Sequence, residues 1–317
     1  MDVLISFLTS IAATYAMAGV AILLLRSRLR VLAWGCAAGA LSAPLIIPAT
    51  EPFPRAAASI LSLDCAFRLV DLLRTRRPIA SLRESLWFIV PFPVMNALWD
   101  WKRLCRERWI ARPGNWRTLI AGCVAFAVCW GVLDATAKNS LLAANHLLDH
   151  TFKLILFVAA VESGALALCA VERLVGFQTT PIVNRTWEAV TPAEFWRRWN
   201  DRIHAWLYRH IFRTFGGTQA PVRAILATCV FSGLFHELMF GISTSRFDGY
   251  QLAFFTIQAP AILLSPRLQS YAKRRGALGA ACSRAITIAW FWATSLLFFH
   301  GIDRVIPIHY TSEPWLP

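Results

Sequence analysis

An adjacent histidine and glutamate interrupt one of the most apolar runs of the sequence. His236 and Glu237 lie near the middle of residues 222–242, where most other side chains are hydrophobic. Ionisable side chains are costly at the centre of a membrane span, so by default they are functional. A neutral imidazole accepts a proton and can therefore serve as a general base toward a hydroxyl. The alternative is a structural histidine that makes a hydrogen bond between helices.

The residues near His236 argue against a metal site. Phe240 stands where the second histidine of a zinc-protease helix would be, which excludes that metal site. Ser232 lies one helical turn earlier and is placed to hydrogen-bond the ring of His236. The eight cysteines lie mostly within apolar runs without metal-ligand spacing, so we predict neither a metal site nor a bound cofactor.

A second unusual segment, residues 181–217, is aromatic and basic at once. Thr191 is expected to cap a helix with Pro192 at its first position and Glu194 at its third. Apolar residues then recur at steps of three and four with arginines beside them, which is typical of a helix at a membrane surface. The residues of this apolar face are Phe195, Trp199, Ile203, Trp206 and either Tyr208 or His210.

Two interpretations of this basic helix stay open. It is either an interfacial anchor or a platform that grips a substrate with an acyl chain and phosphates, because guanidinium groups suit phosphate oxygens. Asn200, in the middle of the helix, offers both a hydrogen-bond donor and an acceptor.

The composition predicts the elements that position these residues. Of the 317 residues, 57% are hydrophobic and 16% charged, against about 45–50% and about 25% in soluble domains. We therefore expect an all-α, polytopic integral membrane bundle of about eight transmembrane helices, with amphipathic or re-entrant cytosolic helices. Nothing marks a domain boundary, so we predict one membrane-embedded domain over 1–317, with its motif core at 181–242.

Six runs are long and apolar enough to cross a bilayer, and two weaker runs make the total about eight. The six are 3–25, 31–50, 118–137, 152–172, 222–242 and 285–302, and the weaker two are 56–73 and 251–266. Residues 79–100 contain Pro91 and Pro93, which favour an interfacial or re-entrant piece. Residues 16–18 are faintly similar to a signal-peptidase site, but the apolar run continues past them, so we expect a retained first span.

The positive charges are unevenly distributed over this topology. The chain has 32 Lys and Arg against 18 Asp and Glu, a net charge of +14 that on its own also suits nucleic acid. With the N-terminus outside, 26 of the 32 basic residues fall in inward loops, as the positive-inside rule requires. We therefore expect cytosolic basic loops, no nucleic-acid partner, and a multi-pass protein of a bacterial inner membrane or an endomembrane.

Four further charged residues within predicted spans are informative. Asp64, Arg68 and Asp71 follow one another at i, i+4 and i+7, so they share one helix face and are predicted to form a structural network. Glu162 stands alone in its span, where it either faces a cavity or partners another helix.

At its two unusual segments the sequence resembles the membrane-bound O-acyltransferase family. That family has an aromatic box in a cytosolic segment, followed by a membrane-embedded histidine. Here the box is Glu-Phe-Trp-Arg-Arg-Trp-Asn, ending at Asn200, and the second motif is Ser-Gly-Leu-Phe-His-Glu-Leu, starting at Ser232. The second motif is close to the form found in the wax-synthase branch. The resemblance is specific over 181–242.

The resemblance implies transfer of an acyl group from acyl-CoA, as co-substrate, to the hydroxyl of a long-chain or other lipid-like alcohol, within a lipid bilayer. It implies that His236 is the catalytic base and that Asn200 assists by hydrogen bonding. The substrate-binding residues it implies are Phe195, Trp196, Arg197, Arg198, Trp199, Ser232 and Glu237.

Two other functions remain alternatives. A small membrane transporter or channel predicts internal repeats or broken helices around a midplane site. An O-acyltransferase acting on a glycan or secondary-metabolite hydroxyl keeps the same chemistry with another acceptor. The sequence leaves the acceptor, the acyl chain length and the oligomeric state open.

Overall fold

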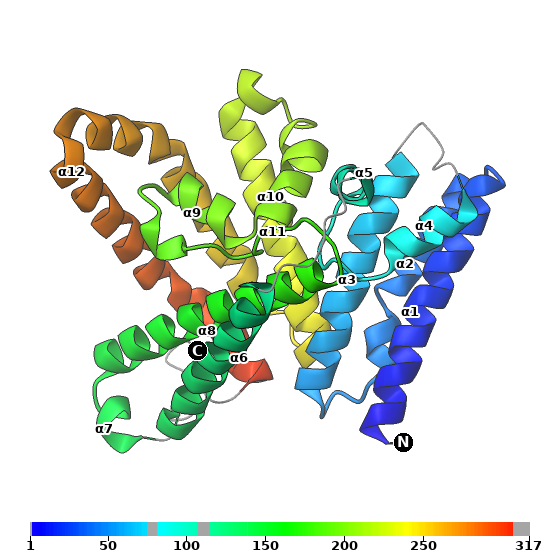
Figure 1. Ribbon diagram of the computed structural model, residues 1–317, viewed down its shortest axis with the longest axis horizontal. Coiled ribbons are helices and arrows are strands. Elements are labelled where there is room, and N and C mark those ends of the chain that lie inside the picture. Colours follow the sequence, from blue (N-terminus) through cyan, green and yellow to red (C-terminus); the bar gives the residue numbers. More distant parts are fainter. Residues whose placement is uncertain (1, 75–80, 107–113, 138, 307–317) are drawn as a thin grey trace. The chain divides into compact units, whose positions relative to one another are not determined.

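The structure is a computed structural model that describes residues 2–74, 81–106, 114–137 and 139–306, and these residues form helices without strands (Figure 1). The expected all-α class is confirmed. Contacts divide the chain into two compact units, Met1–Arg108 with Leu238–Asp248, and Trp109–Glu237 with Gly249–Pro317. The single domain expected from the sequence stays a prediction.

The described residues of the first unit form six helices, and the end of α11 also belongs to this unit. They are α1 (Val3–Arg26), α2 (Arg30–Ala40), η1 (Ala43–Ile46), α3 (Pro52–Arg74), α4 (Leu82–Ile89) and α5 (Leu98–Arg106). Its core lies where α1, α2 and α3 pack together, around small residues such as Ala18, Ala33 and Cys65. Small side chains let helix backbones approach closely, which is how helices pack in a membrane.

Part of the charged network predicted for α3 is present, namely the pair of Arg68 and Asp64. The Nε of Arg68 donates to the Asp64 carboxylate at 2.8 Å, and its Nη1 donates to the backbone carbonyl of Phe88 at 2.8 Å. Asp71 accepts the backbone N–H of Leu98 at 2.7 Å. These buried charges therefore tie α3 to the chain around α4 and α5, which is a structural role.

Two predicted segments of this unit differ from a simple span. The prediction of one span over 31–50 is wrong, because α2 ends at Ala40 and Pro44 lies in the short helix that follows. Proline has no backbone N–H to donate and so does not continue a helix. Residues 81–100 hold α4, a non-helical stretch and the start of α5 rather than one span, and residues 79–80 of that predicted piece lie outside the described residues.

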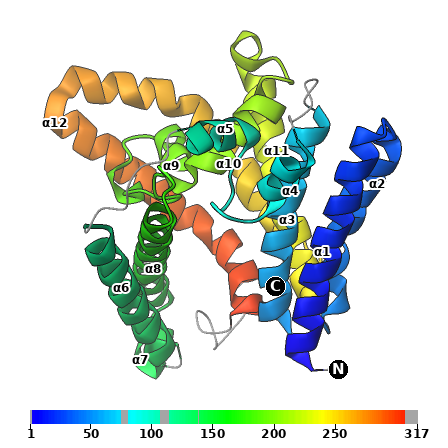
Figure 2. The same cartoon turned by 45° about the vertical axis from the view of Figure 1, so that its right-hand side comes forward.

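The second unit holds the two motifs. Its elements are α6 (Gly114–Thr136), α7 (Ser140–Ala143), α8 (His146–Leu174), η2 (Thr186–Glu188), α9 (Pro192–Trp199), α10 (Asp201–Leu207), η3 (Tyr208–Phe212), η4 (Gly217–Gln219), α11 (Pro221–Thr244, its last residues in the first unit) and α12 (Tyr250–Val305). In both views α12 doubles back on itself (Figure 2). Its backbone leaves helical geometry at Gly276, where φ is 59°, a value that glycine tolerates.

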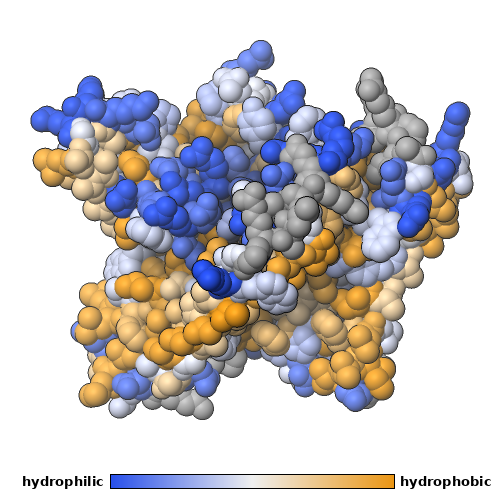
Figure 3. Space-filling model, viewed as in Figure 1, coloured by the Kyte–Doolittle hydropathy of each residue, from blue (hydrophilic) through white to orange (hydrophobic). Residues whose placement is uncertain are grey.

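Helices α6 and α8 pack side by side along their lengths (Figures 1 and 2). Gly122 permits this approach, because a Cβ on it would lie 2.9 Å from the backbone oxygen of Ser163. The outer surface of the pair is apolar, with Ile120, Val128 and Ile155 each about 60% exposed, and hydrophobic residues dominate it in Figure 3. Such a surface suits lipid rather than water.

Five of the described helices are long and apolar enough to cross a membrane by length and composition: α1, α6, α8, α11 and α12. The last of these covers both predicted runs 251–266 and 285–302 in its two arms. The chain is therefore an integral membrane protein, whereas the predicted total of about eight spans is not confirmed.

Candidate active site

His236 lies on α11 with a defined hydrogen bond on one ring nitrogen. Its Nδ1 is 2.8 Å from the backbone carbonyl oxygen of Ser232. A carbonyl only accepts, so Nδ1 carries the hydrogen, and in the neutral ring Nε2 keeps its lone pair. The predicted contact with Ser232 exists, but it uses the backbone rather than the hydroxyl. The ring is thereby oriented with Nε2 able to accept a proton.

Two aromatic residues of α12 support the imidazole. The ring of Phe255 stacks on His236 with centroids 4.0 Å apart and planes 26° apart, and Phe298 meets it edge-on at 6.3 Å. Both phenylalanines also line the cavity of this unit. The histidine therefore lies directly behind the wall of that cavity.

Glu237 is engaged with the start of α12. Its Oε1 accepts the backbone N–H of Gly249 at 2.8 Å, and its Oε2 accepts that of Gln251 at 3.1 Å. Gly249 is the N-cap of α12 and has no side chain to satisfy these groups. A carboxylate also interacts favourably with the positive end of a helix dipole. The structure thus gives Glu237 a capping role, and its substrate contact stays a prediction.

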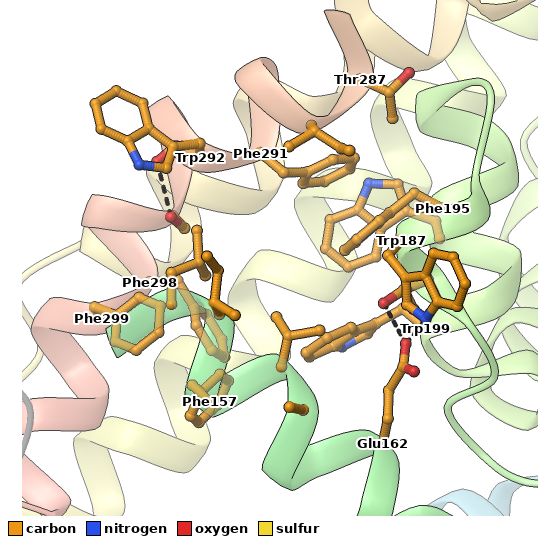
Figure 4. Close-up of a pocket in the computed structure, with 18 of the residues that line it drawn as sticks. Phe157, Glu162, Trp187, Phe195, Trp199, Thr287, Phe291, Trp292, Phe298 and Phe299 are labelled. Atoms are coloured by element: carbon orange, nitrogen blue, oxygen red, sulfur yellow. Dashed lines mark hydrogen bonds between the residues drawn. The ribbon is translucent and has the colours of Figure 1, made fainter. Parts of the chain in front are cut away.

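A cavity of about 510 Å³ lies between α8, η2, α9 and α12 (Figure 4). Nearly all of its lining is apolar, and aromatic rings make up much of it. The aromatic lining residues are Phe157, Trp187, Phe195, Trp196, Trp199, Phe254, Phe255, Phe291, Trp292, Phe298 and Phe299. Apolar pockets with a few polar groups are typical ligand sites.

The aromatic residues of the predicted box form one wall of this cavity. Phe195, Trp196 and Trp199 all line it from α9. Phe195 stacks between Trp199, at 5.7 Å, and Phe291 of α12, at 3.6 Å between centroids. The structure therefore brings three predicted binding residues together, and their contact with substrate stays a prediction.

The two arginines of the box have different surroundings. Arg197 is exposed, whereas Arg198 forms ion pairs with Glu194 at 2.9 Å and Glu188 at 3.4 Å. Burial alone would raise the pKa of Glu194, but the hydrogen bonds from Val190 and Arg198 outweigh it and hold this pKa below its ordinary value. Arg198 therefore links α9 to η2 through its ion pairs. Arg197 is the arginine of the box that is exposed.

The predicted continuous helix over the box is corrected at Asn200. As predicted, α9 begins after Thr191, whose hydroxyl accepts the N–H of Glu194 at 3.2 Å. The helix then stops, because Asn200 has φ −157° and ψ 89° and its Oδ1 caps α10 by accepting the N–H of Ile203 at 3.0 Å. Asparagine favours caps over helix interiors.

His236 and Asn200 are not brought into contact. The imidazole contacts the Ser232 carbonyl and three phenylalanine rings, and none of these contacts involves Asn200. Asn200 has a structural role as a cap, and its assistance in chemistry stays a prediction.

A buried ion pair anchors this segment to α8. Both terminal guanidinium nitrogens of Arg202 donate to the carboxylate of Glu172, at 2.9 and 2.6 Å. Burial alone would lower the pKa of Arg202, but the hydrogen bonds and the charge of Glu172 raise it above its ordinary value. This pair was missed from the sequence, since residues 30 positions apart carry no periodic signal.

Comparison with known proteins identifies the family of this chain. The family model of membrane-bound O-acyltransferases matches residues 92–300. Diacylglycerol O-acyltransferase 1 of Corylus americana is 33% identical over 66% of this chain and 41% of its own length. Probable sterol O-acyltransferase 1 of Schizosaccharomyces pombe is 35% identical over 29% of this chain and 17% of its own.

A third relative has a similarly short match. Diacylglycerol O-acyltransferase 1B of Glycine max is 31% identical over 26% of this chain and 17% of its own length. The chain therefore matches less than half the length of these three relatives. The family model covers well over half of the chain and includes both motifs. The chain belongs to the membrane-bound O-acyltransferase family.

Proposed function

We propose that this protein is a membrane O-acyltransferase that moves an acyl group from acyl-CoA to the hydroxyl of a lipid-like alcohol. The observation that carries this proposal is His236, held by the Ser232 carbonyl with Nε2 available as a base, against a wall of an aromatic cavity. The names of the relatives, diacylglycerol and sterol O-acyltransferases, support the same reaction class.

The reaction needs one general base near the hydroxyl of the acceptor alcohol. Nε2 of His236 takes the proton of the hydroxyl as its oxygen attacks the thioester carbon. The tetrahedral intermediate then breaks its C–S bond, the ester leaves, and the imidazolium returns the proton to the CoA sulfur. Orientation of both reactants in a largely dry cavity supplies part of the rate. The protein needs no covalent intermediate.

The donor would approach from the basic side. The chain folds Arg197 outward beside the aromatic wall of Trp196 and Trp199, so its charge can meet the CoA phosphates while the acyl chain enters among the rings. We place the basic loops on the cytosolic side, following the uneven distribution of Lys and Arg.

The acceptor would be apolar. We infer a long-chain alcohol, as in wax synthesis, because the Ser232–Leu238 motif has the wax-synthase form. A sterol or a diacylglycerol is the acceptor that the relatives' names suggest.

Ester formation in isolated membranes tests the proposal. Membranes with the protein receive radiolabelled acyl-CoA and, separately, a long-chain alcohol, a sterol or a diacylglycerol. We expect a labelled ester from at least one acceptor, and a loss of about 100-fold or more in His236→Ala, as for removal of a general base. His204→Ala, at an exposed histidine of α10, is the matched control and should keep the activity.

Two results would overturn parts of the proposal. Full activity of His236→Ala would refute the assignment of the base. Lack of ester from every acceptor, with folded protein in the membrane, would refute the acyltransferase function.

A further inference from the structure

One carboxylate stands in the otherwise apolar wall of the cavity. Glu162 projects from α8. Among the described residues that line the cavity, it is the one with an ionisable side chain, and the other polar groups are hydroxyls and indoles. A carboxylate within a membrane span is costly and is functional by default. The proposed reaction does not use it, because His236 supplies the base.

Only one oxygen of this carboxylate is occupied. Oε1 of Glu162 accepts both the backbone N–H and the hydroxyl of Thr186, each at 2.6 Å. Oε2 makes no hydrogen bond to any residue that the structure describes. The contact with η2 therefore explains why the side chain is held in place, but not why a second acceptor atom borders the cavity.

An ionised carboxylate can only accept hydrogen bonds. In an apolar site such a bond is electrostatically stronger than in water, and an unmet acceptor is costly. Oε2 is therefore available to a donor on the molecule that occupies the cavity. A hydroxyl fits this need without placing a second charge in the site.

Glu162 and His236 lie near different sides of the cavity. Figure 4 shows Glu162 and Trp187 on one side of the cavity, and Phe298 and Phe299 on the other. Phe298 contacts the ring of His236. A ligand that reaches both sides has polar groups at its two ends and an apolar middle.

Resting on the proposed function, we propose that Glu162 is a specificity-determining residue that binds a second hydroxyl of the acceptor. The preferred acceptors are then long-chain diols, in which one hydroxyl is acylated at His236 while the remote hydroxyl donates to Oε2 of Glu162.

Three alcohols of matched chain length test the proposal with purified protein in lipid nanodiscs: a primary alcohol, the α,ω-diol, and the alcohol with a terminal methoxy group. After correction for two equivalent hydroxyls, kcat/KM for the diol should exceed that for the primary alcohol by about tenfold or more at the best chain length, as expected for a hydrogen bond to a charged group.

The variant Glu162→Gln makes the test specific. Its carbonyl can keep both bonds from Thr186, while its NH₂ replaces Oε2 with a donor. We expect the diol preference to fall at least severalfold and the methoxy alcohol to improve. Glu84→Gln, at an exposed glutamate of α4, should keep the preference. Equal kcat/KM for diol and primary alcohol in the unmodified protein, or an unchanged preference in Glu162→Gln, would overturn the proposal.

Binding without turnover separates this proposal from the proposed function. Quenching of tryptophan fluorescence reports on the cavity, because Trp187, Trp196 and Trp199 line it. Tighter binding of the diol than of the primary alcohol, lost in Glu162→Gln, supports the role of Glu162 even if no ester forms. Equal binding of the two alcohols contradicts it even if the protein is an active acyltransferase.

Discussion

The carboxylate of Glu237 accepts the backbone N–H of Gln251 at 3.1 Å, which joins the residue after the candidate base to the first turn of α12. The same turn continues into Phe255, whose ring stacks on His236. The base and its aromatic support are thus fastened to each other by the adjacent side chain.

Loss of this cap is expected to weaken the fold. Glu237→Ala leaves the N–H groups of Gly249 and Gln251 without their acceptor and should lower the free energy of unfolding by about 1–2 kcal/mol. Glu237→Gln keeps one acceptor and should lose less. Thermal unfolding in detergent measures both. An unchanged Tm combined with a raised KM would instead favour the substrate-binding role.

Asn200 allows its capping role and its chemical role to be separated. Asn200→Ser keeps a side-chain oxygen that can accept the N–H of Ile203, so stability should stay within about 0.5 kcal/mol, whereas Asn200→Ala should lose about 1 kcal/mol. Ester formation by the serine variant then reports on chemistry alone. A stable but inactive serine variant would establish that the amide has a part in the reaction.

The pair of Arg202 and Glu172 should respond unequally to single and double substitution. Arg202→Met leaves a buried carboxylate unpaired and should cost about 3–5 kcal/mol, whereas adding Glu172→Met should recover most of that loss. A double-mutant cycle by chemical denaturation gives the coupling. Additive losses would mean that the two charges do not stabilise each other.

The close packing of α6 and α8 depends on a missing side chain. Gly122→Ala places a Cβ 2.9 Å from the backbone of Ser163 and Ala167, so the helices must move apart, at a cost of about 1–3 kcal/mol. Gly131→Ala on the same helix meets nothing within 4 Å and should leave Tm unchanged or higher. Equal Tm values for the two variants would contradict this packing.

Acid should weaken the segment that carries the box. The pKa of Glu194 is lowered in the folded protein, so its contribution to stability is complete above the pKa of the unfolded chain, about 4.3, and is lost as the pH falls through the folded value. Tm should therefore fall less in Glu194→Gln than in the unmodified protein as the pH is lowered from neutral to about pH 3. Parallel pH profiles would exclude the effect.

Local signals in the sequence predicted the parts of the fold that depend on neighbouring residues. The cap at Thr191 and the i, i+4 pair of Asp64 and Arg68 are both present, because each needs only one helix turn. The end of α2 at Ala40 was missed, since hydropathy over 31–50 outweighed its prolines. Asn200 was predicted for its functional groups, but the same groups also break the helix there.

The cavity itself was beyond reach of the sequence. Phe254, Phe291 and Phe298 belong to both arms of α12, and an aromatic residue in an apolar run carries no sign of whether it faces lipid, core or ligand. The return of α12 at Gly276 brings Phe298 of its second arm against Phe254 of its first arm. Among the residues of the wall, Glu162 was the one that its charge identified from the sequence.

Phe255 has two roles, since its ring stacks on His236 and the residue also lines the cavity. A smaller side chain there would enlarge the cavity but also release the imidazole. Attempts to broaden the range of accepted molecules by engineering should therefore begin at Leu154 or Val158 on α8, which line the same cavity without bordering the histidine.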